Sequence, residues 1–193
     1  MLKTIDNVLL VDRSIMAELS PRVTNRYLHL VDLAAEHLTT NVDNLKFSGH
    51  NFALGFKTNA NHSRSVRIYA SKSVARNKVD IDFGEILFDD SNAVRATLNI
   101  PESVYEESHV GAGEPMKIIS HTFSHDVFVR APKSKGDIQS FITSASLKDI
   151  EVKNLTRPIE IVFKLNQEIT EERNASCVYW GIGKKRRNNY ERE

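Results

Sequence analysis

The sequence predicts an α+β protein that is mainly β: a short helical segment followed by a twisted antiparallel β-sandwich. Apolar residues recur at helical spacing at the start of the chain, and from about residue 50 they alternate with polar ones. Many short alternating runs separated by Gly-, Asn-, Ser- and Asp-rich turns are typical of a sandwich. We therefore divide the chain into a helical segment at 1–42, a sandwich at 43–183 and a basic tail at 184–193, predicted to be disordered.

Two stretches in the helical segment have an amphipathic pattern. Leu2, Ile5, Val8 and Leu9 form one apolar stripe at helical spacing. A second stripe follows Ser20-Pro21, which predicts an N-cap and a proline in the first helical position, where its missing N–H costs nothing. The second helix should be about 17 residues long, which is typical of a globular helix.

The strands are predicted from alternation of apolar and polar residues. Pro101 interrupts the runs and favours a short helical turn, and Val110–Pro115 is the clearest loop. The expected strands are Phe52–Phe56, Val66–Ile68, Val79–Phe83, Val94–Ile100, Lys117–Phe123, Val127–Arg130, Phe141–Leu147 and Ile159–Leu165.

The last of these strands is the most regular. Ile159, Ile161, Phe163 and Leu165 are two residues apart with polar residues between some of them, so we expect one buried and one solvent-facing side. After a polar linker come the only cysteine and the only tryptophan, in Cys177-Val178-Tyr179-Trp180.

An Asn-Leu-x-x-Pro-Ile strand, a polar linker and Cys177-x-x-Trp180 together resemble the end of the GAIN domain of adhesion G-protein-coupled receptors, where the chain enters the GPCR proteolysis site (GPS). The runs Phe141–Leu147 and Leu2–Leu9 also resemble parts of that domain. In the family, Cys-x-x-Trp is followed by a second tryptophan, further cysteines and a His-Leu-Ser/Thr tripeptide at the cleaved bond. Trp180 is followed here by Gly181-Ile182-Gly183 and basic residues, so the resemblance implies a domain truncated before that tripeptide.

The resemblance implies a non-enzymatic role. The family's domain cleaves itself when a Ser or Thr hydroxyl attacks the preceding carbonyl, and it then shields the tethered agonist strand that follows the cut. Because we expect the chain to lack the tripeptide, we expect no self-cleavage. The absent strand should leave an apolar groove, for which Ile159, Ile161, Phe163, Leu165 and Trp180 are the lining candidates. The implied partners are the missing strand and seven-helix region of the parent receptor, and an extracellular protein ligand.

Charge and hydropathy argue against two other classes of protein. The net charge of +1 argues against a nucleic-acid binder, and no apolar run is long enough to cross a bilayer. The N-terminus lacks the apolar stretch of a secretory signal, whereas the resemblance implies the extracellular face of the plasma membrane.

A lone cysteine suits either a buried thiol or, beside Trp180, half of a disulfide whose partner is missing. Asn61, Asn154 and Asn174 begin glycosylation sequons, as would suit an extracellular glycoprotein.

We expect no metal, cofactor or catalytic residue. His121 and His125 are four apart, but their surroundings read as strand and turn rather than as a metal-binding helix. Asp80, Asp82 and the acidic turn at 89–92 could hold calcium, yet acidic turns between strands look the same without an ion. The serines at 140, 144 and 146 lack the surroundings of a nucleophile, and Lys184–Arg187 is interpreted as a solvated tail.

Two other interpretations stay open. One is the related domain of a polycystin or egg-jelly-receptor protein, which carries a similar cleavage site. The other is a free-standing β-sandwich adhesion or ligand-binding module, in which Cys177-x-x-Trp180 is a coincidence.

Overall fold

A computed structural model of the chain describes residues 1–9, 21–40, 42–59, 65–73, 75–84, 93–108, 115–124, 138–148, 150, 152, 155–167, 176 and 177. The helices are α1 (Leu2–Val8), α3 (Pro21–Thr39) and α4 (Ser103–Glu107). The strands are β1 (Asn44–Ser48), β2 (Phe52–Asn59), β3 (Val66–Ser73), β4 (Lys78–Phe83), β5 (Val94–Ile100), β6 (Met116–Phe123), β7 (Ile142–Leu147) and β8 (Glu160–Phe163).

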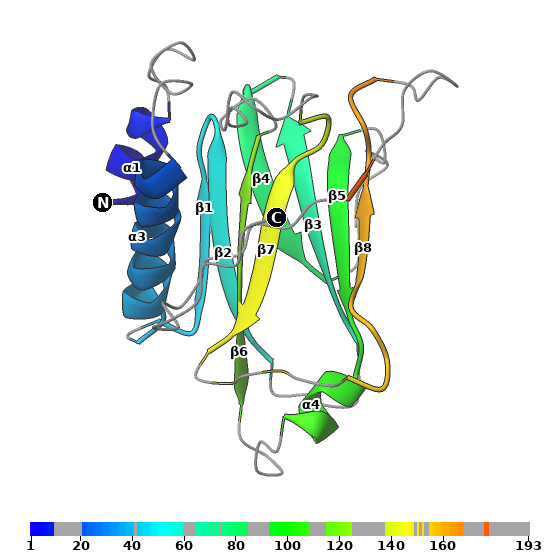
Figure 1. Cartoon of the computed structure of the whole chain (residues 1–193). Helices are drawn as coiled ribbons and strands as arrows, with labels where there is room; N and C mark the ends of the chain where they lie inside the picture. The colour runs from blue at the N-terminus through cyan, green and yellow to red at the C-terminus, as the bar shows by residue number, and fades with distance from the viewer. Residues whose placement is uncertain are drawn as a thin grey trace, which may run out of the picture.

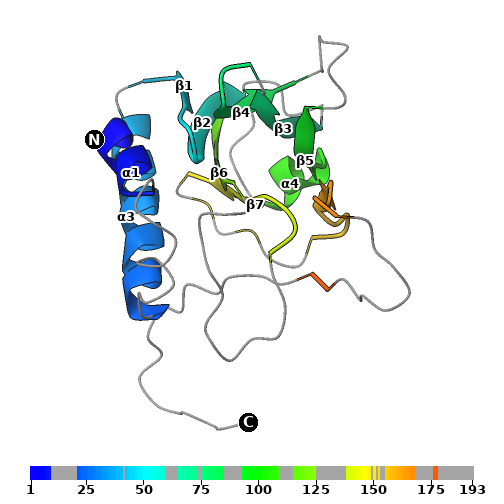
Figure 2. The same ribbon diagram turned by 90° about the horizontal axis from the view of Figure 1, so that it is seen from above.

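The strands form two four-stranded sheets, and α1 and α3 add a helical layer. Sheet A has the order β1-β2-β6-β7 and sheet B the order β4-β3-β5-β8. Every pairing between described strands is antiparallel. Figure 1 shows the sheets with the two helices on one side, and Figure 2 shows the same layers from above. The predicted helical segment and antiparallel sandwich are confirmed.

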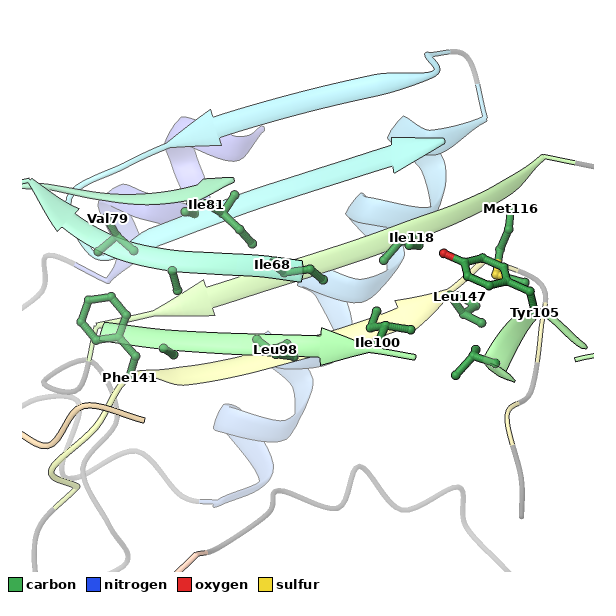
Figure 3. Packing of buried hydrophobic residues seen from close by; sticks show 14 residues of the cluster. Ile68, Val79, Ile81, Leu98, Ile100, Tyr105, Met116, Ile118, Phe141 and Leu147 are labelled. Carbon is green, nitrogen blue, oxygen red and sulfur yellow. The ribbon is translucent and has the colours of Figure 1, made fainter. Parts of the chain in front are cut away.

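The main core lies between the two sheets (Figure 3). Ile68 and Ile81 of sheet B and Ile118 of sheet A are fully buried there. Phe141, just before β7, and Leu147 of β7 also pack in this core, and Val104 and Tyr105 of α4 cover one end. Alternating apolar positions in these strands meet in the core because successive side chains of a strand point to opposite faces.

A second core joins sheet A to the helices. Val31 and Ala35 of α3 pack with Phe52, Phe56 and Phe123. The Phe52 and Phe123 rings stack with centroids 5.0 Å apart. Sheet A is therefore buried on both faces, which explains why five successive residues at the start of β2 are buried instead of every second one.

Polar contacts hold the helices against sheet A. The buried carboxylate of Asp6 accepts the backbone N–H groups of His50 (2.9 Å) and Asn51 (3.0 Å) in the β1–β2 turn. The Tyr27 hydroxyl of α3 donates to the Ile5 carbonyl of α1 at 2.8 Å. At the other end of α3, Lys117 Nζ donates to the carbonyl of Thr39 at 2.6 Å, which satisfies a helix-terminal acceptor.

The sheets are fastened along one side, where β1 faces β4. Lys46 Nζ lies 3.1 Å from Asp80 and 2.7 Å from Asp82. The Val79 N–H donates to the Gly49 carbonyl at 2.7 Å, so a backbone hydrogen bond also crosses from one sheet to the other.

Three local expectations need comment. Helix α3 begins at Pro21, as predicted, and runs to Thr39. Strand β1 was not predicted from the sequence. It is only five residues long, and its Leu45 and Phe47 are half-buried. The strand expected at 127–130 lies outside the described residues, and none of the described helices has the length and apolar character needed to span a bilayer.

Candidate functional site

The candidate site is the edge of sheet B formed by β8, the last strand that the structure describes. Ile161 pairs with Leu98 of β5, and Phe163 pairs with Ala96. Among the described strands, none lies beyond β8, so the outer row of its backbone groups has no partner strand in the part of the chain that the structure describes. Figure 1 shows β8 in orange at the side of the sandwich farthest from the helices.

Apolar side chains of this strand are only partly covered. Phe163 packs against the core between the sheets, and Ile161, two residues earlier, shares its inward face. Ile161 is nevertheless 46% exposed and Ile159 is 37% exposed, while Val162 on the outward face is 56% exposed. Leu165 is half-buried just after the strand. The described chain thus leaves apolar surface uncovered at this edge.

The turn before β8 is anchored to helix α4. The Thr156 N–H donates to the Glu107 carboxylate at 3.0 Å, and the Thr156 hydroxyl donates to the same group. Arg157 pairs with Glu102 at 3.2 Å. Carboxylates bind backbone and hydroxyl donors more strongly than neutral acceptors do, so α4 fixes where the strand begins.

The chain after β8 is tied to both sheets. The Lys164 N–H continues the ladder by donating to the Arg95 carbonyl at 2.8 Å. The Asn166 N–H donates to the Gln139 carbonyl, also at 2.8 Å, just ahead of β7 in sheet A. Strand β8 is therefore held at both ends, while its middle stays exposed.

A shallow hollow of about 540 Å³ lies beside this anchor. Buried polar atoms near it, Asn99 Oδ1 and Ser103 Oγ, have no hydrogen-bond partner within the described part of the chain. The lining residues are Ser65, Asn99, Pro101, Glu102, Arg157, Pro158 and Glu160.

Most of the other residues singled out from the sequence lie outside the described part of the chain. Cys177 is exposed, and no second cysteine exists in the chain to pair with it. Trp180, Asn61, Asn154, Asn174 and the tail at 184–193 lie outside the described residues.

The structure brings no candidate metal ligands together in the part that it describes. His121 lies in β6, with its imidazole Nδ1 3.7 Å from an Asp32 oxygen, and His125 is outside the description. Asp80 and Asp82 flank Lys46. No group of three or more His, Cys, Asp or Glu side chains suitable for a metal occurs among the described residues.

The expectation that the chain lacks a His-Leu-Ser/Thr tripeptide is wrong, because His37-Leu38-Thr39 matches it. This tripeptide is the last turn of α3, and the Thr39 hydroxyl donates to the Glu36 carbonyl at 2.6 Å. Attack on a preceding carbonyl requires a strained turn that aligns the hydroxyl with it, and a regular helix does not supply that geometry. In this structure the tripeptide is therefore not held in the geometry that the attack requires.

The fold is an antiparallel sandwich flanked by helices, with a partly exposed apolar strand at one edge of sheet B. The family model described as GPS, GAIN subdomain B, matches residues 37–189, and the chain belongs to that family. The resemblance seen in the sequence is thereby confirmed.

A solved structure shows the same fold. The full extracellular region of zebrafish Gpr126/Adgrg6 matches with a TM-score of 0.73 and 17% sequence identity. The match covers 94% of this chain but 24% of that one, so the chain spans about a quarter of the zebrafish region. A comparison with curated protein sequences finds no match.

Proposed function

We propose that this chain is part of the extracellular GAIN domain of an adhesion G-protein-coupled receptor, and that it acts as a non-enzymatic module whose β8 edge seats a further strand of the parent receptor. The resemblance implies that this strand is the tethered agonist. Family membership and the fold shared with a receptor's extracellular region support the assignment.

The proposal rests on the partial exposure of β8, which pairs with β5 on one side and has no described strand on the other. Ile161 is 46% exposed on the inward face, although the residue two positions later packs in the core. A strand that is anchored at both ends but apolar and unpaired along its edge is suited to pairing with an added strand. Such edges are otherwise protected by charge or by a covering segment.

The first test uses a linked strand. An alternating Val-Thr nonapeptide is fused after residue 193 through a flexible Gly-Ser linker, which gives an effective concentration on the order of millimolar. The control fusion carries two prolines in the nonapeptide, which remove ladder donors. We expect slower amide exchange in β8 and a higher urea midpoint only with the pairing-competent peptide, and Ile161→Lys should abolish both effects.

Val42→Lys is the matched control, because Val42 is also exposed (44%) but lies away from β8. Equal exchange in the two fusions would overturn the proposal. Protection that appears in the unfused chain and rises with protein concentration would also count against it, because the edge would then pair with a second copy.

The second test concerns cleavage. We predict that the purified chain keeps a single intact mass of 21.9 kDa after prolonged incubation. A product that begins at Thr39 would show that His37-Leu38-Thr39 is cut and would refute the non-cleaving role.

The free-standing module remains the second candidate. Its supporting observation is that β8 is already fastened by α4 and by Gln139 without any further strand. A monomeric, cooperatively unfolding chain that gains nothing from the linked strand would favour it.

A further inference from the structure

His121 occupies an unusual position beneath the helical layer. It lies on the face of β6 that carries Ile119 and Phe123, which pack in the core between sheet A and the helices. Its side chain is 11% exposed, and its ring meets the Phe123 ring edge-on with centroids 5.5 Å apart. An imidazole in such a place is stable when neutral, because burying its cation among apolar groups is costly.

The groups around His121 would stabilise a protonated imidazole only weakly. From α3, the Asp32 carboxylate approaches to 3.7 Å, which is too far for a hydrogen bond, and Asp32 is 40% exposed. His29 and Glu36 flank Asp32 on the same helix. The positions paired with His121 on the neighbouring strands are Leu54 and Ser144, and neither titrates.

We propose that His121 makes the joint between α3 and sheet A releasable by mild acid: protonation of its imidazole frees α3 from the sheet while sheet B stays folded. This inference does not depend on the proposed function. It concerns the helical layer, which lies on the opposite side of the molecule from β8 (Figure 1).

The direction follows from proton linkage. Burial lowers the pKa of His121 to about 4 from its usual 6.5. When α3 leaves the sheet, the imidazole becomes exposed and regains an ordinary pKa, so the open form binds the proton more tightly. The joint is thus fully stable above pH 6.5 and weakens as the pH falls towards 4. From these two pKa values, the equilibrium constant for opening rises about 20-fold between pH 7 and pH 5.

The other polar contacts of the joint explain why release should stay local. The hydrogen bond from Lys117 to the Thr39 carbonyl does not involve a histidine, and it ties the C-terminal end of α3 to β6. Sheet B is held by its own core and by the Lys46 pairs, with no buried histidine among its described residues. Acid should therefore loosen the middle of α3 first.

The test is amide exchange of the whole chain, measured as protection factors from pH 7 to pH 4.5. We expect the protection factors of Leu28–Leu38 of α3 to fall about 20-fold between pH 7 and pH 5, while those of β3 and β5 stay unchanged. His121→Leu should remove the pH dependence of α3. His37→Gln, which alters an exposed histidine of the same helix, should leave the dependence unchanged.

A further variant keeps the test decisive if His121→Leu does not fold. His121→Gln keeps a neutral polar side chain at this position that cannot take up a proton, so the pH dependence of α3 should be lost in this variant as well. The proposal is overturned if α3 and sheet B lose protection together, or if His121→Leu keeps the parent profile. A pH dependence of α3 that persists in His121→Gln also counts against it.

Discussion

The contact between α1 and the β1–β2 turn yields a sharp prediction, which concerns Gly49. A Cβ atom at this glycine would lie 2.4 Å from Asp6 Cγ and 2.5 and 2.6 Å from its two carboxylate oxygens. Ordinary contacts between such atoms are about 3.5 to 4.0 Å, so Gly49→Ala must displace the Asp6 carboxylate. The backbone itself accepts alanine, because Gly49 is not among the described residues with positive φ.

The cost follows from what the carboxylate holds. Its hydrogen bonds to the N–H groups of His50 and Asn51 are 2.9 and 3.0 Å long. Hydrogen bonds to a charged group contribute roughly 1.5–3 kcal/mol each, so losing both costs about 3–6 kcal/mol. Asp6→Ala should cost a similar amount. In the double variant the steric conflict is gone, so Gly49→Ala should add less than about 0.5 kcal/mol.

The assay is urea unfolding followed by circular dichroism for the parent chain, both single variants and the double variant, with Asn7→Ala as an exposed control on α1. We expect a coupling free energy of about 3 kcal/mol between positions 6 and 49. Additive costs for the two substitutions would show that Gly49 is not required by its approach to Asp6, and the reasoning would be refuted.

Two further predictions concern the sandwich and its last strand. In Gly55→Ala, the new Cβ would lie 2.7 Å from the Phe83 ring between the sheets, and such overpacking should cost about 1–3 kcal/mol in urea unfolding; an unchanged midpoint would contradict it. Glu107→Ala removes both acceptors of Thr156 and should speed amide exchange in β8 about tenfold, whereas the exposed Glu106→Ala should not; equal exchange in the two variants would show that α4 does not anchor the strand.

The elements themselves were predictable where one local pattern dominates. Pro21 and the stripe after it predicted α3, because proline is favoured in the first turn and the apolar face has helical spacing. Alternation predicted β5, which the structure places at Val94–Ile100. The family resemblance came from a short motif near the end of the chain, and the family model confirms it.

What the sequence could not predict depends on contacts between distant residues. Asp6 meets the backbone of His50 and Asn51 across more than forty positions, and backbone donors leave no trace in a sequence. The expected burial of one whole face of the last strand also differs from the structure. Phe163 packs on the core, but Ile161 is left uncovered at the sheet edge, and alternation alone cannot distinguish an edge strand from a central one.

The attachment between β1 and β4 has a mechanical consequence. Lys46 and the Gly49 carbonyl fix the spacing of the two sheets along that side. On the side of β7 and β8 they are joined by the Asn166–Gln139 backbone hydrogen bond, so we expect any widening of the sandwich to begin where that bond opens. Widening there is a rotation of one sheet about the fixed side rather than a separation of the two. Because α1 and α3 are packed on sheet A, such a rotation carries the helical layer with it, and an event at the far margin of the molecule is transmitted to the helices as a change of tilt.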